Sequence, residues 1–112
     1  MSRDPQLSLE DIEAAARKIA RYAEGLERDA IFSDEMRFDA VLYNLHVIGE
    51  AVKNLPDDFR RRHQEVAWRE IAGMRDFVAH AYFALDLDIL WDAIRNDVPD
   101  LLERVTAIDE RE

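Results

Sequence analysis

Four side chains that can bind an anion or move a proton lie within one short stretch: Arg75, Asp76, His80 and Tyr82. A guanidinium offers two parallel donors to a phosphate, and an imidazole changes protonation near neutral pH. On an ideal helix each residue advances by about 100°, which places these four opposite an apolar arc. The stretch 68–82 is therefore predicted to be an amphipathic helix with chemically active side chains on its solvent face.

The spacing of these residues predicts how they act together. Asp76 and His80 are four apart, so the acid can hold the orientation and tautomer of the imidazole. Arg75 and His80 are five apart, about 140° around one straight helix, and converge poorly. They converge if the helix ends near His80 or if two copies of the face meet. Ala72 and Ala79 allow such a close approach, so we expect a homodimer through this face.

Composition predicts one folded domain over residues 1–112. Hydrophobic residues make up 48% of the chain and charged residues 36%, and only three Gly and three Pro are present for turns. Cysteine is absent, which excludes a disulfide framework and a thiolate metal site. No apolar stretch is long enough to span a bilayer, and no apolar run follows the N-terminus. We therefore expect a soluble cytoplasmic protein without membrane attachment.

The net charge of −10 argues against general nucleic-acid binding, because such proteins gain affinity through Lys and Arg. A nucleic-acid substrate would need a local basic site. Arg60–Arg62 form a basic run, with Arg69 and Arg75 beyond it. The alternative is a solvated helix end facing water, and the acidic balance also fits a basic protein partner.

Apolar residues recur at helical spacing along the chain. A first helix is predicted from a capping sequence at Ser8 to near Arg28. A second begins at Ser33-Asp-Glu and is stopped by Pro56, and a short helix follows Pro56.

After the helix over 68–82, Asp86 is a fair N-cap for a last helix that runs to Ile108, with a kink or break at Pro99. The fold class is therefore all-α, a four- or five-helix antiparallel bundle.

The second predicted helix carries His46 and Glu50 four residues apart. We expect His46 to be a partly buried, hydrogen-bonded histidine, because a His-Glu pair without a third ligand is a poor metal site. No Gly-rich nucleotide loop and no Ser or Cys nucleophile arrangement stands out. The sequence thus predicts neither a cofactor nor a bound metal.

The motif Arg75-x4-His80-x-Tyr82 resembles the signature of HEPN-domain ribonuclease toxins of the HepT type. Further matches extend over nearly the whole chain and are Phe38-Asp-Ala40, Ile48-Gly-Glu-Ala51, Trp68-Arg-Glu-Ile-Ala-Gly-Met-Arg75 and Asp97-Val-Pro-Asp-Leu101. The residue after the motif Arg is often Asn in that family, and here it is Asp76. The resemblance implies a HEPN-like bundle that forms homodimers.

The resemblance also implies metal-independent cleavage of RNA, in which the 2′-hydroxyl attacks the adjacent phosphorus. Arg75 would stabilise charge on the phosphate, His80 would transfer the proton and Asp76 would orient His80. Glu50 would lie near the active face as a supporting residue. DNA lacks the 2′-hydroxyl and would not react.

A third implication of the resemblance is toxin–antitoxin control through Tyr82. The partner in that family is a minimal nucleotidyltransferase antitoxin that adds AMP to this tyrosine. A larger heteromeric complex of the two proteins is also compatible with the resemblance. Bulk and negative charge would then oppose binding of an RNA phosphate. Two alternatives remain open: a non-catalytic helical subunit that docks on a nucleotidyltransferase, and a homodimeric structural bundle. Without the resemblance, the four polar residues are also explained as ordinary surface and helix-end residues.

Overall fold

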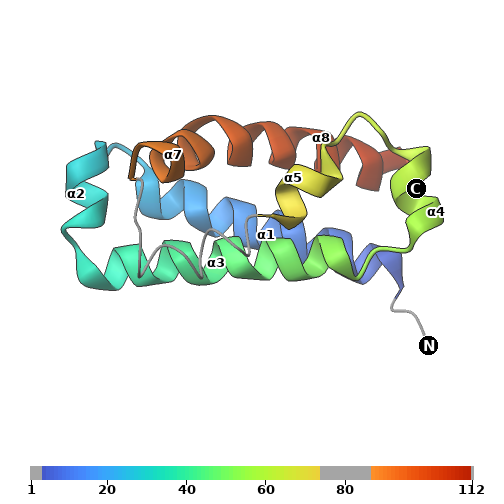
Figure 1. Cartoon of the computed structure of the whole chain (residues 1–112), viewed down its shortest axis with the longest axis horizontal. Helices are drawn as coiled ribbons and strands as arrows, with labels where there is room; N and C mark the ends of the chain where they lie inside the picture. The colour runs from blue at the N-terminus through green and yellow to red at the C-terminus, as the bar shows by residue number, and fades with distance from the viewer. Residues whose placement is uncertain (1–3, 74–86, 112) are drawn as a thin grey trace.

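Two long antiparallel helices, α1 (Pro5–Ala23) and α3 (Glu35–Lys53), pack along their length and organise the bundle (Figure 1). A third, α8 (Val98–Arg111), packs against α1. The computed structural model describes residues 4–73 and 87–111, and it contains no strand within these ranges. This confirms the predicted all-α class.

The first helix begins earlier than its capping sequence predicted. Asp4 is the N-cap, and its Oδ1 accepts a hydrogen bond from the Gln6 backbone N–H at 2.9 Å, while Pro5 occupies the first turn. Ser8 is fully buried inside α1, so its predicted capping role is wrong. The predicted end near Arg28 is also wrong, because the chain turns at Gly25 with φ of +72°.

A short helix that the periodicity did not predict, α2 (Arg28–Phe32), follows this turn. Five residues are too few to display a helical repeat. The next helix, α3, agrees with its prediction. Its N-cap is Asp34, whose Oδ1 accepts the Arg37 backbone N–H at 3.2 Å, and it ends at Lys53 before Pro56.

The predicted short helix is α4 (Asp57–Arg62), with Pro56 as its N-cap. It leads to α5 (Trp68–Ala72), which packs against α3. The helix predicted over 68–82 is confirmed only for this first part, since its remainder lies outside the described residues.

The last helical region consists of α7 (Leu87–Asp92), a π-helical turn η1 (Ala93–Asp97) and α8. No break occurs at Pro99, because the chain stays helical from Leu87 to Arg111. The helix instead widens into the π-helical turn immediately upstream of Pro99. Proline has no N–H to donate to the preceding turn, so the regular i to i−4 ladder cannot pass through it. The predicted N-cap Asp86 lies outside the described residues.

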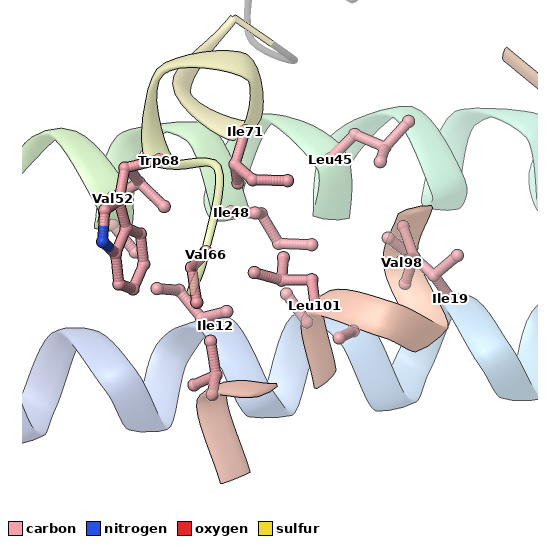
Figure 2. Packing of buried hydrophobic residues seen from close by; sticks show 14 of the residues in the cluster. Ile12, Ile19, Leu45, Ile48, Val52, Val66, Trp68, Ile71, Val98 and Leu101 are labelled. Atoms are coloured by element: carbon pink, nitrogen blue, oxygen red, sulfur yellow. The ribbon is translucent and has the colours of Figure 1, made fainter. Parts of the chain in front are cut away.

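The core lies where α1, α3 and α8 meet. Ile12, Ile48 and Leu101 come from these three helices and belong to one buried cluster (Figure 2). Each such side chain stabilises the fold by about 1.5–3 kcal/mol through removal of its apolar surface from water. Across residues 4–73 and 87–111, no helix is both long and apolar enough to cross a membrane.

Candidate functional site

The predicted site residues Arg75, Asp76, His80 and Tyr82 all lie outside the described residues, so their roles and mutual geometry stay predictions. The structure does describe the elements on both sides of them. Helix α5 precedes this stretch and α7 follows it, and both are anchored on the rest of the bundle.

Trp68 fixes the start of α5. Its side chain is only 6% exposed, and its indole N–H donates to the backbone carbonyl of His63 at 2.8 Å. Its ring packs 6.4 Å from that of Phe59, measured between centroids, and Ile71 is buried one turn later. At Gly73 a Cβ atom would lie 3.2 Å from a backbone oxygen of the preceding turn. The chain therefore enters the predicted catalytic stretch from a tightly packed position.

The start of α7 is held from the opposite end of the bundle. Asp88 forms an ion pair with Arg28 of α2, and Leu90 is buried. The Trp91 ring meets the edge of Phe32 at a centroid distance of 6.5 Å and an interplanar angle of 85°. These contacts give the chain after the predicted catalytic stretch a fixed position on α2.

Helix α3 carries the supporting residue Glu50, which is half-buried on the same helix that α5 contacts. Its proposed role near the active face stays a prediction. His46 is exposed, so the expected partial burial is wrong: it lies on the solvent side of α3. Two neighbours on this helix, Met36 and Tyr43, are 84% and 65% exposed.

The basic run of α4 is largely neutralised within its own helix. Arg60 pairs with Asp57, and Arg61 pairs with Asp58. The guanidinium of Arg62 lies 5.6 Å from the centroid of the Phe59 ring. These contacts favour the interpretation of the run as a solvated helix end.

Arg69 on α5 differs from that run. Its side chain is exposed, and within residues 4–73 and 87–111 it has no ion-pair partner. It stands six residues before Arg75, at the start of the chain that leads into the predicted site. Arg69 is thus an exposed cation that lies close in sequence to the predicted site.

Burial and acidic neighbours raise the pKa of two carboxyl groups, those of Glu13 and Asp97. Desolvation raises the pKa of Glu13 on α1, and the neighbouring carboxyl group of Asp109 on α8 raises it further. Burial also raises the pKa of Asp97, with contributions from Asp92 and Asp100. The sequence pattern did not reveal the first pair, because its members stand far apart in the chain.

A cavity of about 370 Å³ opens between the end of α1 and the α7–η1 region. Trp91 and Arg95 line it, and the Arg95 guanidinium lies 5.9 Å from the centroid of the Trp91 ring. This site was not predicted from the sequence. The four-residue spacing of an aromatic and an arginine was the available signal.

Comparison with known proteins covers almost the whole chain. The profile of the family described as "Ribonuclease HepT-like" matches residues 12–108. A probable ribonuclease HepT of Thermococcus cleftensis is 41% identical over 101 residues, which is 90% of this chain and 92% of the relative. A protein of Caldanaerobacter subterraneus subsp. tengcongensis, named as a candidate RNase, is 36% identical over 110 residues, 98% of both chains.

A longer relative from Methanocaldococcus jannaschii is named as a gamma-glutamylcyclotransferase and candidate RNase. It is 34% identical over 110 residues, and this chain spans 50% of its length. No solved structure matches the chain significantly. The profile match and the relatives of similar length agree with the resemblance carried by the motifs. The chain therefore belongs to the ribonuclease HepT-like family.

Proposed function

We propose that this chain is a metal-independent endoribonuclease whose catalytic groups are Arg75 and His80. The observation that carries the proposal is the motif Arg75-x4-His80-x-Tyr82 inside a chain of the ribonuclease HepT-like family. The RNase names of several relatives support the same activity.

In the proposed reaction, the 2′-oxygen of RNA bonds to the adjacent phosphorus while the bond from phosphorus to the 5′-oxygen breaks. His80 transfers the proton that the 2′-hydroxyl loses or that the leaving 5′-oxygen gains. Arg75 donates hydrogen bonds to the non-bridging oxygens as their charge grows. Asp76 orients His80, and Glu50 supports the site from α3.

We propose further that the site is composite, with Arg75 of one chain facing His80 of its partner in a two-fold dimer. The five-residue spacing supports this arrangement, since the two side chains converge poorly on one helix. Mixing Arg75→Ala chains with His80→Ala chains tests it. Heterodimers would contain one intact site, so cleavage should return to about a quarter of the wild-type level at equal mixing. No recovery despite subunit exchange would contradict the composite site.

The proposed biological role is that of a toxin, neutralised by a minimal nucleotidyltransferase antitoxin. The phenol oxygen of Tyr82 would attack the α-phosphorus of ATP and release pyrophosphate. The added AMP places a negative charge close to where the RNA phosphate must bind. Family membership and the position of Tyr82 two residues after His80 support this role.

The isolated chain offers a direct test. It should cleave an RNA oligonucleotide in EDTA at the rate seen without EDTA, and it should spare the same oligonucleotide with a 2′-deoxy residue at the cleaved position. Loss of cleavage in EDTA would refute metal independence. A folded chain that binds a nucleotidyltransferase but cleaves no RNA would instead favour a non-catalytic docking subunit.

A further inference from the structure

The cavity beside Trp91 is an open depression between two parts of the bundle. One wall is the last turn of α1 and the turn after it, and the other is the region from α7 to the start of α8. It is lined by Ala20, Ala23, Glu24, Gly25, Leu26, Glu27, Trp91, Ile94, Arg95 and Pro99. Its volume of about 370 Å³ is in the range of small-molecule pockets. A Cβ added at Gly25 would meet no heavy atom within 4 Å, so this side of the cavity is open.

Trp91 provides a flat surface that its neighbours hold in place. Phe32 meets it edge-on at 6.5 Å, and Phe38 in turn packs against Phe32 at 5.3 Å between centroids. Arg95 lies over the ring from the π-helical turn η1. Aromatic rings and guanidinium planes are the surfaces on which unpaired nucleobases stack.

Two carboxylates, Glu24 and Glu27, complete the lining. Both residues are exposed, and neither side chain has a hydrogen-bond or ion-pair partner in the part of the chain that the structure describes. Carboxylates only accept hydrogen bonds, so they repel a phosphate and favour a ligand edge with N–H donors. Guanine presents two such donors side by side, N1–H and the N2 amino group, whereas adenine presents a single amino group on that edge.

We propose that this cavity, the Trp91 pocket, binds a guanine base of the RNA substrate. The base stacks on Trp91 and Arg95, and Glu24 or Glu27 accepts from its N1–H and N2 amino group. The pocket stands nine residues beyond Tyr82, on the helix that follows the predicted catalytic stretch. This assignment rests on the proposed ribonuclease function and adds a base preference to it.

The binding test uses the two indole N–H signals of the protein in nuclear magnetic resonance. Guanosine 5′-monophosphate should shift the signal of Trp91 and leave that of buried Trp68 in place. Adenosine 5′-monophosphate should bind about tenfold more weakly, the discrimination that one good bidentate contact provides. Equal affinities, or no shift of Trp91 with either nucleotide at millimolar concentration, would overturn the proposal. A shift by spermidine alone would instead identify a site for organic cations.

A matched pair of substitutions on α1 tests the location. Ala20→Leu fills the pocket from an exposed helical position, whereas Ala14→Leu makes the same change at an exposed position away from the pocket. The first should weaken nucleotide binding about tenfold and the second should not change it. Equal effects of the two would contradict the assignment. Glu24→Gln combined with Glu27→Gln should abolish the preference for guanine, and an unchanged preference would remove the carboxylates from the proposal.

Cleavage assays separate this inference from the proposed function. Among oligonucleotides that differ at one position, wild type should cleave the guanine-containing one fastest, and Ala20→Leu should remove this advantage. RNA cleavage without any guanine preference or nucleotide binding would refute the pocket and leave the ribonuclease standing. Guanosine monophosphate binding at Trp91 in a chain that cleaves no RNA would refute the ribonuclease and leave the pocket standing.

Discussion

The carboxyl group of Asp109 on α8 lies close enough to that of Glu13 on α1 to raise the pKa of Glu13. Glu13 is only 9% exposed, and its Oε1 has no hydrogen-bond partner among the described residues. The side-chain amide of Gln6 donates to Asp109. Burial and the neighbouring carboxyl group both disfavour the ionised form of Glu13. The contact between α1 and α8 is therefore strongest when Glu13 is protonated.

This pair predicts how stability depends on pH. Burial and the neighbouring Asp109 carboxyl group raise the folded-state pKa of Glu13 above its ordinary value of 4.5. The stability contributed by its protonated form is complete below that value and is lost as the pH rises through the folded-state pKa. Glu13→Gln removes the buried charge and keeps the shape of the side chain, so the variant should become more stable than wild type by about 1 kcal/mol at neutral pH.

Urea unfolding of both proteins between pH 4 and pH 8 would measure this effect. The free-energy difference should be small at the acid end and should grow as the pH rises. Glu110→Gln, at an exposed position on α8, serves as the control and should show no such trend. A difference between Glu13→Gln and wild type that stays constant with pH would contradict the raised pKa of Glu13.

Trp68 is predicted to position the chain that leads to Arg75. Trp68→Phe keeps an aromatic ring near Phe59 but removes the indole N–H that the His63 carbonyl accepts. The variant should lose about 1 kcal/mol of unfolding free energy. RNA cleavage should fall by more than the small unfolded fraction explains, because the start of α5 is then held less precisely in position. A normal cleavage rate in the destabilised variant would show that α5 does not position the site.

We predict that removing the positive charge of Arg69 and removing that of Arg61 have different effects on RNA binding. Arg61 is paired with Asp58 within α4, whereas Arg69 has no such partner in the described ranges. Arg69→Ala should weaken RNA binding about three- to tenfold. It should also reduce the slope of log binding constant against log salt concentration by about one, the loss of one phosphate contact. Arg61→Ala should leave both nearly unchanged. Binding titrations over a range of salt concentrations measure the two slopes, and equal slopes would count against Arg69.

Tyr82 is the predicted switch. Tyr82→Phe removes the hydroxyl that would receive AMP and leaves the ring, so the variant should cleave RNA and resist a co-expressed nucleotidyltransferase. Intact-mass spectrometry after incubation with that enzyme and ATP should show AMP on wild type and none on the variant. Addition of AMP to Tyr22 or Tyr43 would remove Tyr82 from this role.

The sequence predicted the long elements of the fold because they display clear periodicity and capping. The apolar stripe of α3 ends before Pro56, as expected, and the α4 helix follows it. The short helix α2 was missed, and the start of α1 was misplaced because a Ser with acidic followers resembles a cap even when it is buried. A local sequence pattern does not show whether a side chain is buried by segments that are far away in the chain.

The candidate site likewise has features that the sequence alone indicates and features that only the folded structure shows. The spacing of Arg75, His80 and Tyr82 is a local pattern, so the sequence alone could suggest its chemistry. The Trp91 pocket needs the end of α1 beside η1, and the Glu13–Asp109 pair needs α8 beside α1. Both arise from tertiary contacts between residues far apart in the chain, which a single sequence does not display.

Cleavage of RNA by purified Arg75→Ala and His80→Ala chains tests the central claim most directly. Each should lose activity by about a hundredfold or more, because phosphate stabilisation and proton transfer are both needed in the transition state. Matched controls are Arg61→Ala and the exposed-histidine variant His46→Ala, which should cleave at the wild-type rate. If Arg75→Ala or His80→Ala cleaves RNA like wild type, with an unchanged circular dichroism spectrum, the catalytic assignment is wrong.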